Sequence, residues 1–227
     1  MKPLITLAQA KTADGAEITL HSKDTHFYLR INREPLMATN APESEKEMAR
    51  IGCSALEGKP KVRVLIGGLG FGFTLRQSLA LVGKDAEVHV AELLSEVIEW
   101  NRTFLSDLNA GCLDDPRVHI HLKDVFTLIA RTPPGFYDAI LLDVDNGPSS
   151  MVLRDNARIY DRRGLNAITL ALKPGGRVVF WSASPDAAFA RRLAKSGFIV
   201  QVVPAKAHAQ AKRKAHTLFV ADPKGKD

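Results

Sequence analysis

The sequence predicts an α/β protein built on an open, doubly wound and mostly parallel sheet of seven strands. Strand and helix patterns alternate from residue 62 to residue 196, which is typical of a parallel sheet with helices on both faces. The third and fourth strand candidates, residues 117–124 and 137–144, are rich in β-branched and large apolar residues, as expected for strands covered on both faces. The last two strand candidates have no helix between them and predict an antiparallel C-terminal hairpin at or near the sheet edge. Together these features indicate a Rossmann-like architecture.

The first forty residues predict a small β segment. Three stretches, ITLAQA, AEITLHS and FYLRINREPL, show partial alternation and are separated by turn residues at Ala13-Asp14-Gly15 and at Lys23-Asp24. A helix is expected next, because PESEKE places acidic residues in a first helical turn. We therefore divide the chain into residues 1–58, a small N-terminal β segment with a linking helix, and residues 59–227, the Rossmann-like part.

The Rossmann-like part is expected to contain seven strands and five helices in alternation. The strands are predicted at residues 62–68, 87–93, 117–124, 137–144, 176–183, 198–204 and 216–221. The helices are predicted at residues 73–82, 95–109, 124–131, 154–172 and 185–196.

Composition limits the classes of function. The formal net charge of +6 indicates a weak general attraction to anions. The two cysteines, Cys53 and Cys112, lie far apart and predict neither a zinc site nor a disulfide framework. His119 and His121 share one face of a strand, but no third ligand is evident, so no metal site is expected. No apolar stretch is long enough for a signal peptide or a membrane span, so we expect a cytoplasmic protein without a membrane partner.

A glycine-rich turn follows the first strand of the Rossmann-like part. Gly68, Gly70 and Gly72 occupy alternate positions in VLIGGLGFGFTLR, between an apolar strand and a helix. Glycine permits positive φ angles and removes the Cβ that would hold a ligand away from the backbone. The turn therefore predicts a ligand at the carboxyl edge of the sheet, although tight packing alone also explains such glycines.

Acidic residues stand at the ends of the next three strands. Glu92 follows Gly72 by twenty residues and is placed to accept hydrogen bonds from ribose hydroxyls, or it is an exposed strand-end residue. Asp124 is placed to accept from an adenine amine, to cap the following helix, or to do both. Asp143, followed by Asp145 and Asn146, is interpreted as a base or an amine clamp rather than as an ordinary turn. We favour function because four successive strands place their polar residues at the same end.

Six motifs in order resemble the spermidine synthase (polyamine aminopropyltransferase) family and, more broadly, the class I S-adenosylmethionine-dependent methyltransferase fold. The motifs are VLIGGLGFGFTLR, VHVAELLSEVIEW, LKDVF, YDAILLDVDNGP, RIYDRRGL and LKPGGRVVF. The resemblance implies a nucleoside-binding catalytic domain over residues 59–227, which takes S-adenosylmethionine or its decarboxylated form together with a small-molecule acceptor. A homodimer is plausible by resemblance only.

The resemblance also implies a role for each matching position. The three glycines would face the reacting end of the nucleoside, and Glu92 would bind the ribose. Asp124 and the backbone of Val125 would bind the adenine. The same resemblance makes Asp143 the catalytic group that accepts a proton from the attacking amine. The acceptor side is assigned to Asp145, Asn146 and Tyr160.

The chain departs from the family pattern on the acceptor side. Phe71 stands where the family has an aspartate, and Glu45 and Lys46 replace a tyrosine and its polar neighbour. The second carboxylate of the family's acidic motif either becomes the amide Asn146 or shifts by one residue to Asp145. Two enzymatic hypotheses stay open: aminopropyl transfer from decarboxylated S-adenosylmethionine, and methyl transfer from S-adenosylmethionine. A third hypothesis, a non-catalytic nucleoside- or nucleic-acid-binding protein, depends on the basic stretch 206–214. A solvated loop is the favoured interpretation of that stretch, so nucleic acid is not expected.

Overall fold

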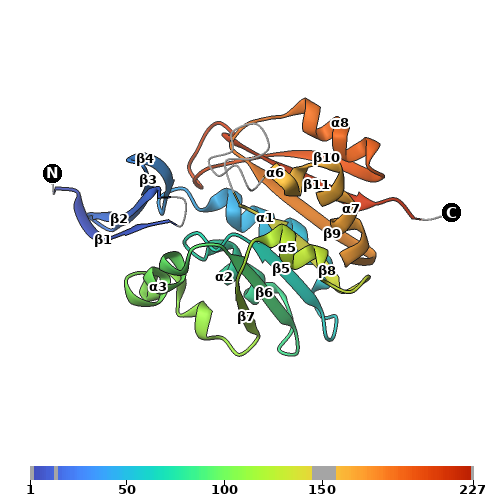
Figure 1. The fold of residues 1–227 in the computed structure, drawn as a ribbon, viewed down its shortest axis with the longest axis horizontal. Coiled ribbons are helices and arrows are strands. Elements are labelled where there is room, and N and C mark those ends of the chain that lie inside the picture. The colour runs from blue at the N-terminus through green and yellow to red at the C-terminus, as the bar shows by residue number, and fades with distance from the viewer. Residues whose placement is uncertain (1–2, 13–14, 145–156, 226–227) are drawn as a thin grey trace.

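A computed structural model describes residues 3–12, 15–144 and 157–225 of the chain. The described residues form two sheets, a four-stranded antiparallel sheet at the N-terminus and a seven-stranded mixed sheet after it. Figure 1 shows the small sheet at one end of the molecule, with α1 (Glu43–Cys53) leading from it to the large sheet. α1 packs against α2 and β9, and the Arg177 guanidinium donates to the carbonyl oxygen of Ile51 over 3.2 Å. The division of the chain at residue 58 stays a prediction.

The small sheet contains one strand more than the three expected stretches. Its strands are β1 (Ile5–Lys11), β2 (Glu17–Lys23), β3 (His26–Ile31) and β4 (Glu34–Ala38). The stretch FYLRINREPL is divided by a two-residue turn, in which Asn32 and Arg33 have φ angles of 48° and 70°. Two residues with positive φ give a turn whose twist matches that of the flanking strands. The Asn32 side chain also accepts a hydrogen bond from the Glu17 amide over 2.9 Å.

The large sheet confirms the predicted fold class. Its strands are β5 (Arg63–Gly67), β6 (Glu87–Glu92), β7 (Val118–Leu122), β8 (Tyr137–Leu142), β9 (Leu172–Ser182), β10 (Phe198–Ala205) and β11 (His216–Pro223). Their order is β10-β11-β9-β8-β5-β6-β7. β5 to β9 pair in parallel, whereas β11 is antiparallel to both β9 and β10. The C-terminal hairpin thus forms one edge of the sheet, as expected.

Helices cover both faces of this sheet. Besides α1 they are α2 (Phe73–Leu81), α3 (Ser95–Thr103), α4 (Ser106–Asn109), α5 (Val125–Ala130), α6 (Ala157–Tyr160), α7 (Arg162–Ala171) and α8 (Ala187–Lys195). Two of the expected helices are each divided in two. At the second division, the Asp161 carboxylate accepts hydrogen bonds from the amides of Arg163 (2.7 Å) and Gly164 (2.9 Å) and begins α7.

The side chains of β5 show how the two faces are buried. Val64 and Ile66 pack in the hydrophobic cluster that contains Met48 of α1. Leu65 points to the opposite face and packs in the cluster that contains Leu165 of α7. A strand apolar on both faces must lie between two helical layers, which is why β5 occupies the interior of the sheet. Within the described ranges, no helix is long and apolar enough to span a bilayer.

Candidate active site

A cleft of about 250 Å³ opens at the carboxyl ends of the parallel strands. This is the position where doubly wound sheets bind ligands, because the strand order reverses between β5 and β8. The small sheet, α1, the strand ends and β9 with β11 all contribute to its wall. The lining comprises Leu29, Leu36, Met37, Ala38, Ala41, Ser44, Glu45, Gly68, Gly70, Ala91, Glu92, Leu93, Leu94, Val97, Lys123, Asp124, Val125, Asp143, Val144, Trp181 and His216.

The glycine-rich turn brings two of its three expected glycines into this lining. Gly68 has a φ angle of 87°, and a Cβ there would overlap the backbone carbonyl oxygen of Asp143. Its lack of a side chain therefore lets the ends of β5 and β8 approach each other at the floor of the cleft. Gly72 is outside the lining and instead caps α2, where a Cβ would lie 3.2 Å from that of Asn109. The turn thus serves packing as well as the cleft.

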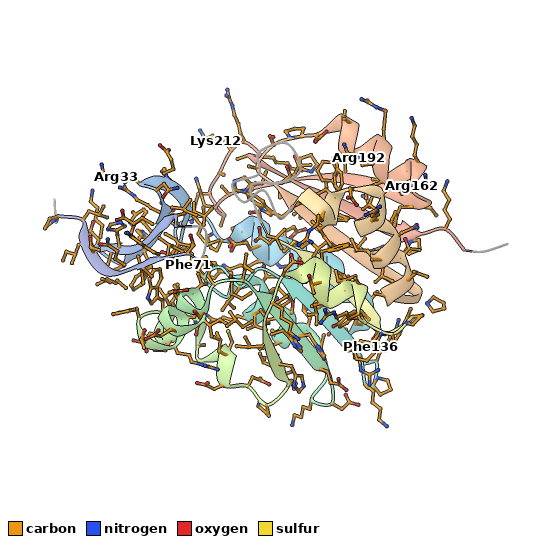
Figure 2. The ribbon with its side chains drawn as sticks, viewed as in Figure 1. Arg33, Phe71, Phe136, Arg162, Arg192 and Lys212 are labelled. Atoms are coloured by element: carbon orange, nitrogen blue, oxygen red, sulfur yellow. The ribbon has the colours of Figure 1, made fainter. Side chains whose placement is uncertain are left out.

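Phe71 does not enter the cleft. Its side chain is 2% exposed, and its ring packs edge-to-face against Phe73 with 6.4 Å between the ring centroids. Figure 2 shows Phe71 between the small sheet and the large one. The aromatic ring that replaces a family carboxylate is thus part of the core and presents nothing to a ligand.

Glu92 lies at the end of β6, with both carboxylate oxygens bonded to the backbone. Oε2 accepts from the Leu69 amide over 2.9 Å, and Oε1 accepts from the amides of Leu93 (2.7 Å) and Leu94 (2.9 Å). Burial raises the pKa of the Glu92 carboxyl, and these three N–H groups oppose that rise by stabilising the anion. Oε1 carries two hydrogen bonds and Oε2 one, so Oε2 retains more capacity to accept from a ligand.

Asp124 caps α5 at the wall of the cleft. Its Oδ1 accepts from the Thr127 amide over 2.8 Å and from the Thr127 hydroxyl over 2.6 Å, and Arg158 lies 3.4 Å from the same oxygen. Among the described residues these contacts all use Oδ1, which leaves Oδ2 as the atom with capacity for a ligand. Asp124 can therefore cap α5 through Oδ1 and contact a ligand through Oδ2 at the same time. Val125, the next residue, also lines the cleft.

Asp143 shares the cleft with a second carboxyl group, that of Glu45, which the family resemblance placed on the acceptor side only as a departure from the family pattern. Burial raises the pKa of Asp143 to about 7. Glu45 of α1 lines the same cleft, and burial followed by repulsion from Asp143 holds the pKa of Glu45 well above its usual range. Two interacting carboxyl groups titrate as a pair, so the cleft retains a proton near neutral pH.

A hydrogen-bonded group of three side chains forms the opposite wall. The Trp181 indole N–H donates to the Ser44 hydroxyl over 3.0 Å, and the Nδ1 atom of His216 lies 2.9 Å from the same hydroxyl. The two rings are 4.8 Å apart between centroids. Burial lowers the pKa of His216, which keeps its imidazole neutral at pH 7. These residues come from α1, β9 and β11, and the sequence analysis assigned none of them to the site.

The charge of the cleft is opposite to that of the chain as a whole. The lining carries four carboxyl groups, those of Glu45, Glu92, Asp124 and Asp143, against the single lysine Lys123. The formal charge of the whole protein is +6. A concave site lined by acidic groups attracts cations even on a basic protein, because the local field decides what enters.

Three other expected site residues do not lie among the described lining residues. Tyr160 is 2% exposed, and its ring packs against Phe180 and Phe189 with centroid distances of 6.1 and 5.5 Å. Asp145 and Asn146 are outside the described residues. The basic stretch 206–214 joins β10 to β11, and Figure 2 shows Lys212 pointing away from the body of the molecule.

Comparisons with known proteins point to one family, that of the spermine and spermidine synthases. A family model described as "Spermine/spermidine synthase domain" matches residues 44–192. The chain is 39% identical over 124 residues to the polyamine aminopropyltransferase of Mycobacterium tuberculosis (strain ATCC 25618 / H37Rv), covering 54% of this chain and 23% of that protein. It is 33% identical over 119 residues to putrescine N-methyltransferase 1 of Nicotiana tabacum, covering 52% of this chain and 30% of that protein.

A solved structure resembles almost the whole chain. The crystal structure of a spermidine synthase in complex with the transition state analogue AdoDATO aligns with a TM-score of 0.78 and 20% identity. The alignment covers 98% of this chain and 75% of that one, which shows that the two proteins share a fold. The chain spans less than a third of the length of either curated relative above.

Proposed function

Because the chain belongs to the spermine/spermidine synthase family, we propose that it transfers an aminopropyl group from decarboxylated S-adenosylmethionine to a small amine. The observation that carries this proposal is the pair of carboxyl groups, Glu45 and Asp143, in a cleft with a net excess of acidic side chains. Both substrates of such a reaction are cations, and paired carboxyl groups attract them.

The nucleoside occupies the half of the cleft beside β6 and β7. Oε2 of Glu92 accepts a hydrogen bond from a ribose hydroxyl, while the three backbone amides hold the carboxylate in place. Oδ2 of Asp124 accepts from the adenine amine, and Val125 borders the base. These assignments rest on the family resemblance together with the free accepting capacity of each oxygen.

Asp143 acts as the base. An acceptor amine arrives as an ammonium ion and must lose a proton before its lone pair can attack. Asp143 takes that proton, the amine nitrogen bonds to the carbon next to the sulfonium, and the carbon–sulfur bond breaks. The electron pair of that bond stays on sulfur, so the leaving group is the neutral thioether methylthioadenosine. A pKa of about 7 suits a base that works near neutral pH.

Glu45 and the Ser44–Trp181–His216 group form the acceptor half. Glu45 offers a carboxyl group to a cationic amine, and Trp181 and His216 enclose its carbon chain. When Asp143 is ionised it would repel the carboxylate of S-adenosylmethionine, whereas the decarboxylated cofactor carries no such group. This electrostatic difference favours aminopropyl over methyl transfer.

Titration calorimetry with four nucleosides tests the proposal. We expect decarboxylated S-adenosylmethionine and methylthioadenosine to bind more tightly than S-adenosylmethionine and S-adenosylhomocysteine. Product analysis with putrescine as acceptor should then detect methylthioadenosine. If none of the four nucleosides binds, the protein is neither an aminopropyltransferase nor a methyltransferase.

Methyl transfer is the second candidate, and one observation favours it. The Nicotiana tabacum relative is named for methyl transfer to putrescine and is 33% identical over the region matched. Tighter binding of S-adenosylmethionine, with S-adenosylhomocysteine as the product, would establish this candidate and exclude aminopropyl transfer. A homodimer is proposed from the family resemblance alone, and light scattering of the purified protein decides it.

A further inference from the structure

We propose that Glu87, His89 and His119 bind a divalent transition-metal ion at a site separate from the cleft. One ligand atom from each of these residues lies within 4.8 Å of the other two. Glu87 and His89 begin β6, whereas Glu92, at the end of the same strand, lies in the cleft. The proposed site does not depend on the proposed transferase activity.

The parallel register of β6 and β7 creates the cluster. His89 pairs directly with His119, and Ala91 pairs with His121. Residues two apart on a strand share a face, so Glu87 and His89 lie on the same face as His119 and His121. In the sequence only His119 and His121 of β7 stand close together. The pairing of β7 with β6 brings Glu87 and His89 beside them.

The two ring nitrogens of His89 have different neighbours. Its Nε2 atom lies 3.5 Å from Oε2 of Glu87, a separation that two ligands of one tetrahedral ion adopt at bond lengths of about 2.0–2.1 Å. Its Nδ1 atom lies 3.1 Å from Nε2 of His121 and 3.4 Å from the Tyr137 hydroxyl. With Nε2 on the ion, Nδ1 would carry the ring proton, and these two neighbours would hold the ring in place.

The remaining ligand lies at the surface. His119 is exposed, and its ring centroid is 5.1 Å from that of His89. An exposed side chain at the end of a cluster gives an ion a path from solvent, and it can turn to shorten the 4.8 Å spacing. Three protein ligands leave a fourth position for water.

The neighbouring charged groups set the chemistry of the ion. Arg63 of β5 pairs with both oxygens of Glu87, over 3.2 and 3.3 Å, and lies against the Phe136 ring. Arg63 therefore keeps the Glu87 carboxylate ionised and in place, but a metal ion would have to share that carboxylate with the Arg63 guanidinium. Two imidazoles and one carboxylate suit Zn²⁺, Co²⁺ or Ni²⁺ and do not suit Mg²⁺ or Ca²⁺.

The proposed metal site and the cleft lie at opposite ends of β6, because Glu87 and His89 begin that strand and Glu92 ends it. Phe136, whose ring centroid is 5.8 Å from that of His89, lies at the lower right of the molecule in Figure 2. β7 is an edge strand held by β6 alone within the large sheet. An ion shared by Glu87, His89 and His119 would join these two strands through side chains, and the folded state would gain stability from binding.

Cobalt titration of tag-free protein, previously treated with chelator, tests the site. We expect one Co²⁺ per chain, with the visible absorption of a four-coordinate ion, and displacement by Zn²⁺ but not by Mg²⁺. Each of His89→Ala and His119→Ala should weaken Co²⁺ binding at least tenfold. His208→Ala, which removes an exposed histidine from the β10–β11 loop, is the matched control and should leave binding unchanged.

Three results would overturn the proposal: no binding at millimolar Co²⁺ or Zn²⁺, retention of binding by both variants, or equal loss in His208→Ala. His119 is exposed, so His119→Ala should fold normally even where His89→Ala does not. The thermal midpoint gives a second measurement, because Zn²⁺ should raise it in the wild type and in His208→Ala but not in His119→Ala.

Discussion

Glu45 and Asp143 line one cleft from two different elements, and repulsion from Asp143 contributes to holding the pKa of Glu45 above its usual range. Glu45 belongs to α1, and Asp143 follows β8. A cationic ligand placed between them would be attracted by both and would lower both pKa values by stabilising the anions. The pair is thus suited to a substrate that carries positive charge into the cleft.

The first prediction concerns the pH dependence of turnover. Asp143 accepts a proton only when its carboxyl is ionised, so kcat/KM should fall about tenfold per pH unit below a pKa of about 7. The bound sulfonium lowers that pKa, so the corresponding limb of kcat should lie at lower pH. Initial rates from pH 5 to 9 measure both limbs. A flat kcat/KM profile between pH 5 and 7 would remove Asp143 from the role of base.

The second prediction concerns Asp143→Asn as a catalytic variant. The amide cannot accept the amine proton, and we expect kcat to fall by about 10² to 10⁴. The affinity for methylthioadenosine should change by less than about threefold, because the proposed nucleoside contacts come from Glu92 and Asp124. Calorimetry and single-turnover assays separate the two effects. Turnover close to that of the wild type contradicts the assignment.

The third prediction concerns stability, and the same variant tests it. A carboxyl in the unfolded chain titrates near pH 4, whereas folded Asp143 keeps its proton up to about pH 7. Between these values the folded state binds more protons, so this group's contribution to stability is lost as pH rises across the window. Asp143→Asn removes that cost and should be more stable than wild type at pH 8 by on the order of 1–3 kcal/mol. Near pH 4 the difference should vanish. Urea unfolding at both pH values measures it.

The fourth prediction distinguishes two roles of Glu92. Glu92→Ala leaves the buried amide of Leu69 and the part-buried amides of Leu93 and Leu94 without their acceptor, and should cost about 1–3 kcal/mol of stability as well as nucleoside binding. Glu92→Gln keeps one oxygen and should fold better while still binding the nucleoside weakly. Calorimetry and thermal unfolding of both variants provide the comparison. Wild-type affinity in Glu92→Gln would show that the ribose does not need this carboxylate.

Much of the fold follows from local sequence patterns. The seven strands of the large sheet could be predicted because apolar runs and turn residues alternate along the chain, and the hairpin because β10 and β11 lack a helix between them. The turn at Asn32-Arg33 that separates β3 from β4 could not be predicted, nor could the break at Asp161 that separates α6 from α7. Positive φ at an arginine depends on the pairing of β3 with β4, and Asp161 resembles an ordinary polar position within a helical pattern until its carboxylate is seen to cap α7.

The cleft likewise contains residues that the sequence predicts and residues that it does not. Gly68, Glu92, Asp124 and Asp143 could be found because parallel strands bring their carboxyl ends to one edge of the sheet. The family resemblance placed Glu45 on the acceptor side, but its pairing with Asp143 could not be predicted, because that depends on how α1 packs. Residues that meet across long separations carry no local signal: the hydroxyl of Ser44 meets Trp181 and His216, which lie more than a hundred residues along the chain.

The last prediction concerns that hydroxyl. Ser44 is 1% exposed, and its hydroxyl joins the Trp181 indole to the His216 imidazole at the wall of the cleft. Ser44→Ala removes the partner of both rings, and a buried donor left without an acceptor costs about 1–3 kcal/mol. The Trp181 and His216 rings would shift to find new partners, which would change the shape of the proposed acceptor pocket. The substitution does not alter the contacts of Glu92 and Asp124.

We therefore expect the KM for the amine acceptor to rise at least fivefold in Ser44→Ala, with the affinity for methylthioadenosine unchanged. Ser54→Ala, at an exposed position just after α1, is the matched control and should leave both quantities at wild-type values. Steady-state kinetics with the acceptor varied, alongside calorimetry with the nucleoside, measure the two effects separately. An equal loss of acceptor and nucleoside affinity would mean that Ser44 supports the whole cleft, and that the acceptor does not lie against Trp181 and His216.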